Sequence, residues 1–295
     1  MSSTDSERRG ILLLVVAAFS FSVMSLQVKL AGEELPVAML VLARGVVTLV
    51  MSVAWIRYRR IPMWGVDRPR LLLRGVLGLG GLACFFYAVT ALPLAEVAVI
   101  HYLNPVLTAV VAALLLGEHV DRRLMVAIGA SLTGTVLVTR PEFLFGGHST
   151  LSPSGVLAAL GGATFSAFAY TTVRRLSRTD NPHVIVFFFP LVAVPATIPF
   201  AVHVWVWPSL RGWLLMLGLG VATQIAQVLF TRGLAVVPAG RGTTVGYVQI
   251  VFAATWGYLF FHDAPNALTV VGAVLIGSST ALLLWRRQPK PASRR

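Results

Sequence analysis

Three polar side chains lie inside one long apolar run of the sequence, the 24 residues from Leu94 to Gly117. His101, Asn104 and Thr108 stand at positions i, i+3 and i+7, so a helix would place all three on one face. About 20 apolar residues suffice to cross a hydrocarbon layer of roughly 30 Å, and polar groups at that depth face a bundle interior or a wet cavity. We predict that this face binds substrate. The imidazole could also take up a proton; the alternative for each group is a hydrogen bond between helices.

Pro105 follows Asn104 and predicts a kink in the same helix, because proline lacks the backbone N–H and clashes with the preceding turn. A kink beside a binding site suits gating, and we expect Pro105 to take that role. The alternative for Asn104 is that its amide caps the carbonyl groups freed by the kink.

Glutamines supply a second polar face. Gln224 and Gln227 stand at i and i+3 in the apolar run 212–231, and Gln249 lies in the run 242–262. Amides can hold the carboxylate and the ammonium of an amino acid without carrying charge, so we predict that these three bind a zwitterionic substrate. Hydrogen bonds between helices, worth about 0.6–2 kcal/mol each, are the alternative.

The stretch 92–120 has a faint echo 145 residues later, at 237–265. Duplicated transporter halves give this kind of pattern, in which residues of one kind recur in the same order at a fixed offset. The ungapped pairing matches Pro93 with Pro238, Tyr102 with Tyr247, Asn104 with Gln249, and Glu118 with Asp263.

Aromatic side chains within the apolar runs are further candidates. We expect Tyr87, Tyr102, Tyr247 and Trp256 to line a substrate cavity, with better grounds for Tyr102 and Tyr247 because the echo pairs them. The alternative for each is a place in an interfacial belt or in helix packing.

Arg44 lies about eight residues into the apolar run 36–56, and a lone charge near the bilayer centre costs at least about 2.5 kcal/mol. We expect the side chain to snorkel outward or to find a partner. Glu96 is the acid that we expect to pair with Arg44 or with the substrate, and Glu33 or Glu34 is the alternative.

The composition identifies the class of protein. Of 295 residues, 57% are hydrophobic and 12% charged, against about 25% charged in an ordinary soluble domain. The chain is therefore expected to be an all-α polytopic membrane protein. Charge clusters and turn residues divide it into ten apolar runs, at 11–31, 36–56, 71–92, 94–117, 123–140, 154–174, 183–203, 212–231, 242–262 and 266–285.

The basic residues predict the orientation. With ten spans and a cytoplasmic N-terminus, only Lys29, Arg140 and Arg211 face the opposite side, and Arg44 lies within a span. Such asymmetry follows the positive-inside rule and places both termini in the cytoplasm. The basic residues that give the net charge of +13 are therefore expected to lie near anionic lipid headgroups rather than to bind nucleic acid. The 20 cytoplasmic basic residues are Arg8, Arg9, Arg57, Arg59, Arg60, Arg68, Arg70, Arg74, Arg122, Arg123, Arg174, Arg175, Arg178, Arg232, Arg241, Arg286, Arg287, Lys290, Arg294 and Arg295.

Five spans in each half is an odd number, so the second half must be inserted upside down. We expect a first five-helix repeat at 1–140, an extracytoplasmic linker at 141–153, a second repeat at 154–285 and a basic cytoplasmic tail at 286–295. Inverted halves place a substrate site near the bilayer midplane, where they meet.

The stretch FFYAVTALPLAEVAVIHYLNPVLTAVVAALLLGEHV at 85–120 resembles the drug/metabolite transporter superfamily and, within it, the ten-helix EamA-type carriers. VVGAVLIG at 270–277 and Arg44 in LVLARGVVTLV carry the same resemblance. In the second copy, Ile250 replaces the family's proline and His262-Asp263 its Gly-Glu. The resemblance implies a carrier of the bacterial inner membrane, often an exporter of amino acids or related metabolites.

No motif for catalysis, a cofactor or a metal is recognised: the sequence has no phosphate loop, no paired zinc ligands and no Gly-x-Ser-x-Gly elbow. Cys84 is the single cysteine, which excludes an intramolecular disulfide. Glu118, His119 and Asp121 form only a thin group for a lipid-modifying membrane enzyme, a remote alternative. Because an acid opposes the dipole at a helix C-terminus, we expect Glu118 to bond to loop amides, a nearby arginine or a helix start.

The sequence thus predicts a secondary transporter that exports amino acids or similar small polar metabolites by alternating access. Its partners would be that substrate and the lipid bilayer, with no ATPase subunit evident and with a monomeric or weakly oligomeric state. Uptake or exchange of nucleotide-like cofactors, amines or other metabolites is the alternative.

Overall fold

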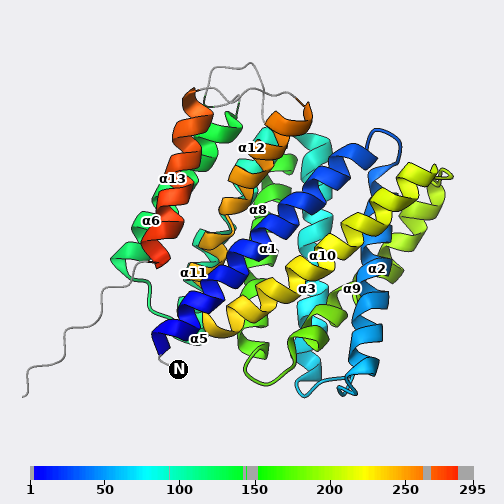
Figure 1. Cartoon of the computed structure of the whole chain (residues 1–295), viewed down its shortest axis with the longest axis horizontal. Helices are drawn as coiled ribbons and strands as arrows, with labels where there is room; N and C mark the ends of the chain where they lie inside the picture. Colours follow the sequence, from blue (N-terminus) through cyan, green and yellow to red (C-terminus); the bar gives the residue numbers. More distant parts are fainter. Residues whose placement is uncertain (1–2, 93, 142–143, 145–151, 262–266, 285–295) are drawn as a thin grey trace, which may run out of the picture.

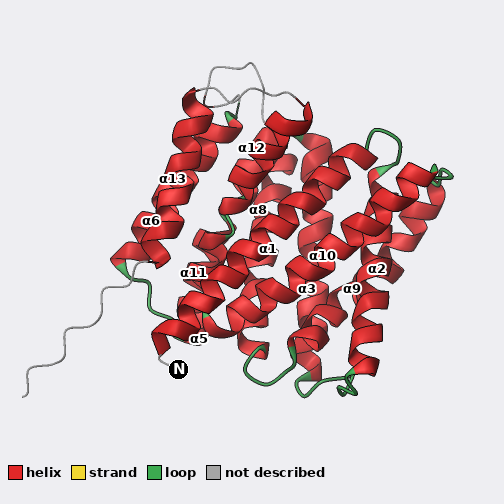
Figure 2. Cartoon of the chain, viewed as in Figure 1, coloured by secondary structure: helices red, strands yellow, loops and turns green. Residues whose placement is uncertain are grey.

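The structure is a computed structural model that describes residues 3–92, 94–141, 144, 152–261 and 267–284. All secondary-structure elements in these ranges are helices (Figure 2). They are α1 (Ser3–Ala31), α2 (Val37–Tyr58), α3 (Arg68–Ala91), α4 (Leu94–His101), α5 (Asn104–Leu116), α6 (Arg122–Thr139), α8 (Pro153–Leu176), α9 (Pro182–His203), α10 (Leu210–Val236), α11 (Ala239–Val245), α12 (Val248–Phe261) and α13 (Ala267–Leu284). The predicted linker at 141–153 lies largely outside the described residues, and the tail at 286–295 lies wholly outside them.

Helix starts carry local signals that the sequence contains. The side chains of Asp67, Asp121, Asn181 and Ser209 each accept a hydrogen bond from a backbone N–H in the first turn of the helix that follows. These residue types are preferred N-caps because their oxygens replace the missing intrahelical acceptors. At the other end of α5, Gly117 adopts the left-handed conformation (φ 66°) that commonly closes a helix.

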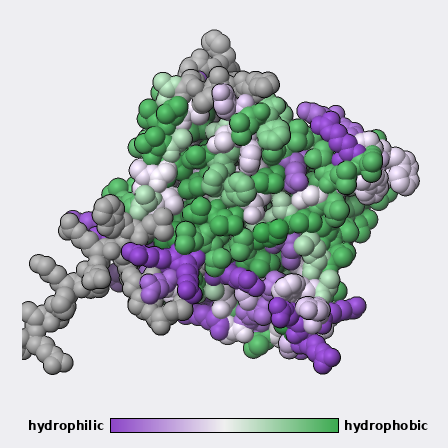
Figure 3. Space-filling model, in the orientation of Figure 1, coloured by the Kyte–Doolittle hydropathy of each residue, from purple (hydrophilic) through white to green (hydrophobic). Residues whose placement is uncertain are grey.

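The protein is a multi-pass membrane protein. Eight helical segments within the described residues are long and apolar enough to cross a membrane, α4 with α5 and α11 with α12 each counting as one segment. Large apolar side chains point outward on these helices, such as Leu114 (79% exposed) and Phe200 (70% exposed). Figure 3 shows an apolar band around the middle, with hydrophilic residues concentrated along one edge. That edge, at which α1 begins in Figure 1, is called the lower face.

The helices of the two halves pack in matching pairs (Figure 1). α1 packs against α10 as α8 packs against α3, and α2 packs against α10 as α9 packs against α3. α5 contacts α8 as α12 contacts α1, while α6 pairs with α13 and α2 with α9. If each run of the first half is interchanged with its counterpart in the second half, the same helix contacts result. Two structurally related halves produce this pattern.

The α6–α13 pair is held by small residues. A Cβ added to Gly134 would come within 2.6 Å of the Gly272 carbonyl oxygen, and one added to Gly272 would come equally close to the Gly134 carbonyl. The hydroxyls of Ser131 and Ser279 hydrogen-bond across the same crossing. Small residues let two helices approach closely in a bilayer, where packing rather than burial from water drives association.

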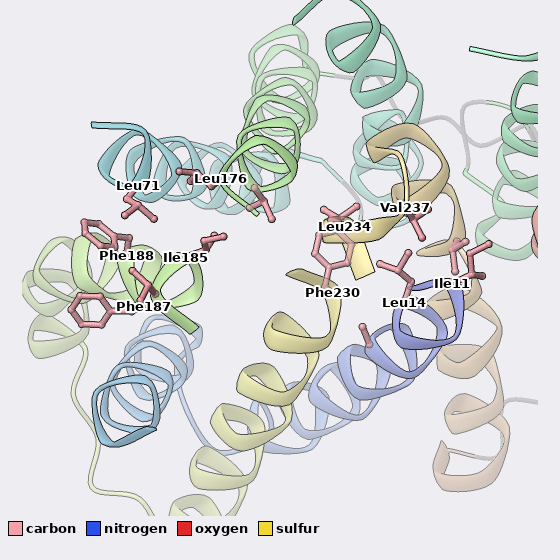
Figure 4. Close-up of a cluster of buried hydrophobic side chains, with 14 of the residues drawn as sticks. Ile11, Leu14, Leu71, Leu176, Ile185, Phe187, Phe188, Phe230, Leu234 and Val237 are labelled. Atoms are coloured by element: carbon pink, nitrogen blue, oxygen red, sulfur yellow. The ribbon is translucent and has the colours of Figure 1, made fainter. Parts of the chain in front are cut away.

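A large hydrophobic cluster closes the lower half of the bundle (Figure 4). Its members come from the ends of helices near the lower face and belong to both halves. Among them, Leu71, Leu176 and Ile185 join α3, α8 and α9, while Leu14 and Leu234 join α1 and α10. The packing therefore connects the two halves on this side of the molecule.

Candidate functional site

The fourth apolar run is broken in its middle. α4 ends at His101 and α5 begins at Asn104. Pro105 has no N–H to donate to the turn before it, and the Leu103 N–H bonds instead to the Ile100 oxygen three residues back, at 3.1 Å. The prediction of a kink at Pro105 is confirmed. The break places His101 at the end of α4 and Asn104 and Thr108 on α5, so the three residues do not belong to one uninterrupted helix.

The ninth run is broken at the equivalent place without a proline. α11 ends at Val245 and α12 begins at Val248. Around Gly246 the hydrogen bonds shorten to three-residue spacing, from the Gly246 N–H to the Thr243 oxygen (3.0 Å) and from the Tyr247 N–H to the Thr244 oxygen (3.2 Å). Tertiary packing and this tight turn therefore reproduce a break that the sequence alone did not indicate.

The two breaks touch each other. The rings of Tyr102 and Tyr247 stack with their centroids 5.4 Å apart, and the Tyr247 hydroxyl donates a hydrogen bond to the Tyr102 carbonyl. Tyr247 is fully buried. The structure thus brings together the two tyrosines that the 145-residue echo paired.

Several polar atoms of the predicted site residues are buried without a hydrogen-bond partner in the described structure. They are Nδ1 of His101, Oδ1 of Asn104, Oγ1 of Thr108 and Oε1 of Gln224. Gln224 is held from its other side, since its Nε2 donates to Oγ of Ser52 at 2.9 Å. Most buried polar atoms in proteins are paired, so this group of acceptors is suited to receive a polar ligand. The rings of His101 and Phe85 pack edge to face, 5.3 Å apart.

Other predicted residues attach α12 to α1. Nε2 of Gln249 lies 3.5 Å from Oγ of Ser25, and the indole N–H of Trp256 donates to Oγ of Ser22 at 3.0 Å. Gln227 is partly buried on α10, one turn beyond Gln224.

Tyr87 is exposed, unlike the stacked Tyr102 and Tyr247. Its side chain is 52% exposed, and its hydroxyl lies 3.3 Å from Oγ of Ser154 on α8. The expectation that it lines a substrate cavity stays a prediction.

Two arginines lie above one aromatic ring. The guanidinium of Arg44, from α2, is 5.8 Å from the centroid of Phe189 on α9, and that of Arg74, from α3, is 5.1 Å from it. Arg74 is only 4% exposed, so its assignment to the cytoplasmic anchors is wrong. The available signal was its position inside the apolar stretch of α3, three residues beyond the start of the run 71–92.

The acids expected near Arg44 are engaged elsewhere or are not described. Glu33 pairs with Arg211 at 3.5 Å, and Glu34 accepts hydrogen bonds from Ser209. The backbone and side-chain hydrogen bonds from Ser209 lower the pKa of Glu34 below its ordinary value. The side chain of Glu96 lies outside the described part of the structure.

Partly buried ion pairs join the two halves at the lower face. Glu118 pairs with Nε of Arg174 at 2.9 Å, and it also accepts a hydrogen bond of 2.7 Å from the backbone N–H of Ala239. Ala239 is the first residue of α11, so the predicted contact with a helix start is present. Arg241 bridges Glu7 and Asp121. In both networks the acids belong to the first half and the arginines to the second.

Within the described residues, no group of three or more His, Cys, Asp and Glu side chains could hold a metal ion. What the described interior offers is polar, hydrogen-bonding and cationic groups together with two broken helices, an arrangement that can bind a small solute.

Comparison with known proteins matches the model of the EamA-like transporter family twice, at residues 8–140 and 153–285. The pseudopaline exporter CntI of Pseudomonas aeruginosa is 34% identical over 92% of this chain and 94% of its own length. Human solute carrier family 35 member G1 is 26% identical over 95% of this chain and 81% of its own length. An S-adenosylmethionine uptake transporter of Rickettsia prowazekii is 21% identical over 76% of this chain and 74% of its own length. A solved crystal structure shares the fold with a TM-score of 0.77 at 21% identity, covering 95% of this chain and 96% of the other.

Proposed function

Because this chain belongs to the EamA-like transporter family, we propose that it is a secondary transporter that exports amino acids or similar small polar metabolites by alternating access. The proposal includes ten transmembrane helices in two inverted halves, 1–140 and 154–285, joined by an outer linker at 141–153. Both termini and the basic tail at 286–295 lie in the cytoplasm, and the membrane is the bacterial inner membrane.

The observation that carries the proposal is the meeting of two broken helices inside the bundle. Tyr102 and Tyr247 stack there, and Asn104 and Thr108, which carry buried atoms without a described partner, lie on α5 directly after the first break. Transporters built from inverted repeats place their substrate at discontinuous helices near the repeat interface, because interrupted backbone and polar side chains are tolerated only where they line a path.

The lower-face contacts support a closed inner gate. Glu118–Arg174 and the Glu7–Arg241–Asp121 network tie the halves together at the lower face, along which hydrophilic residues gather (Figure 3). Opening toward the cytoplasm would have to break these pairs and separate the hydrophobic cluster beneath them. Alternating access then consists of one half rocking against the other about the tyrosine pair.

Export is the direction favoured by the relative at 34% identity, whose name is that of an exporter. The more distant relative named for uptake makes the opposite direction the alternative outcome. His101 is the group through which a proton could couple to the substrate, since imidazole titrates near neutral pH.

Purified protein in proteoliposomes tests the proposal through efflux and uptake of a panel of labelled amino acids, with and without a pH gradient. Saturable flux is expected. Thr108→Val removes an unpartnered buried hydroxyl and should lower flux without lowering the unfolding temperature, whereas Thr164→Val, on the exposed surface of α8, should change neither. His101→Ala should abolish the response to the gradient. Absence of flux above empty liposomes, from folded protein, contradicts the proposal.

A further inference from the structure

Arg44 and Arg74 form a cation pair inside the bundle that no described acid neutralises. Both guanidinium groups lie within 5.8 Å of the Phe189 ring centroid, and Nε of Arg74 is buried without a hydrogen-bond partner. The one contact of Arg44 at hydrogen-bonding range is the weak acceptor Sδ of Met24, at 4.0 Å. The pair therefore keeps guanidinium N–H donors that are available to a ligand.

No acid in the described part of the chain pairs with either arginine. The sequence has only 11 acidic residues, and those described lie at helix ends or in loops. Two like charges buried in a bilayer are costly, and intramembrane cations are normally paired or line a functional path. An anionic ligand would remove this cost.

The helix that carries Arg74 is connected to the first broken helix through α8. α3 packs against α8, and α8 in turn contacts both α4 and α5. The arginine pair and the first break therefore adjoin the same helix of the second half.

From this geometry we infer that the transported substrate is a small organic acid with at least two carboxylates, which Arg44 and Arg74 bind. The inference rests on the proposed transport function and specifies its substrate class. Guanidinium binds carboxylate with two parallel hydrogen bonds, so two arginines suit two carboxylates. A simple zwitterion would neutralise only one cation and would bring an ammonium for which the described interior offers no acid. A cofactor phosphate is the competing anion and forms a separate arm of the test.

The test measures thermal unfolding of the detergent-purified protein with succinate, L-glutamate, L-glutamine or AMP. Glutamate and glutamine have nearly the same shape and differ by one charge. Succinate and glutamate should stabilise the wild-type protein and bind about tenfold or more tightly than glutamine. Arg44→Gln and Arg74→Gln should lose that preference, whereas Arg211→Gln, in an exposed pair, should keep it. Preference for AMP over both dicarboxylates overturns the inference.

The unfolding temperature measured without ligand separates an effect on binding from an effect on folding. Since Arg74→Gln removes a buried charge that lacks a counterion, the ligand-free variant should unfold at the wild-type temperature or above while binding is lost. An arginine with a purely structural role would give the opposite, a lower unfolding temperature. Arg74→Lys keeps the charge but not the paired hydrogen bonds, and should bind with intermediate affinity.

Flux in proteoliposomes distinguishes the two proposals. Saturable glutamine flux that is unaffected by Arg44→Gln and Arg74→Gln overturns the dicarboxylate inference and leaves the transporter proposal intact. Succinate-dependent stabilisation that is lost in Arg74→Gln, with no flux of any compound, supports the anion site and contradicts transport. Neither stabilisation nor flux contradicts both.

Discussion

Replacing Arg174 with Met should lower the free energy of unfolding by about 3–5 kcal/mol, the range seen when one partner of a buried ion pair is removed. The side chains of Arg174 and Glu118 are only 14% and 12% exposed. Methionine keeps an unbranched apolar stem that reaches about as far as Nε of the arginine, so the change mainly removes the charge and its hydrogen bonds. Glu118 would remain buried with the Ala239 N–H as its one described donor.

The same arginine also satisfies the end of α10. Its Nη1 donates to the carbonyls of Leu234 at 2.8 Å and Ala235 at 2.7 Å, and each buried acceptor left unpaired costs about 1–3 kcal/mol. These losses overlap with the loss of the ion pair and are not additive. They place the expected value in the upper part of the range.

Reversible unfolding in mixed detergent, followed by far-UV circular dichroism, measures the effect. Arg211→Met is the matched control, because its pair with Glu33 is 3.5 Å long and more than half exposed on both sides, and should lose no more than about 1 kcal/mol. Adding Glu118→Gln to Arg174→Met should recover part of the loss, since the buried charge disappears. If Arg174→Met is no more destabilising than Arg211→Met, the network does not hold the halves together.

Three further changes test other parts of the structure. Gly134→Leu should destabilise the protein by about 1–3 kcal/mol or more because its Cβ meets the facing carbonyl of α13, whereas Gly129→Leu, with no atom within 4 Å, should change the unfolding temperature little. Tyr247→Phe keeps the ring stack but loses the hydroxyl contact, so it should cost about 1 kcal/mol and slow flux, unlike exposed Tyr258→Phe. Burial raises the pKa of Asp121, but the Leu124 N–H and Arg241 outweigh it and lower the pKa below 3.8; stability should therefore fall with acidification below about pH 4, and Asp121→Asn should remove that part of the pH dependence in unfolding curves. A pH profile unchanged by the substitution contradicts the assignment.

Features that depend on local chemistry were predictable. Each apolar run overlaps a helix or, for the fourth and ninth runs, a broken pair of helices, and α1 begins eight residues before its run. Pro105 breaks its helix, because hydropathy and the missing N–H act over a few residues of chain. The stacking of Tyr102 on Tyr247 was anticipated only as a pairing in the echo. Nothing in the sequence placed the two rings in contact.

By itself, the sequence determined the class of protein, the helical runs, the N-caps and the first helix break, since each follows from composition or from neighbours along the chain. Tertiary structure decided the rest. The burial of Arg74, the exposure of Tyr87, the partner of Glu118 and the second break at Gly246 all depend on which helix faces which. In a bundle where nearly every helix is apolar on all sides, hydropathy shows that a residue lies at membrane depth but not whether it faces lipid or protein. Only the packing of the two halves supplies that direction.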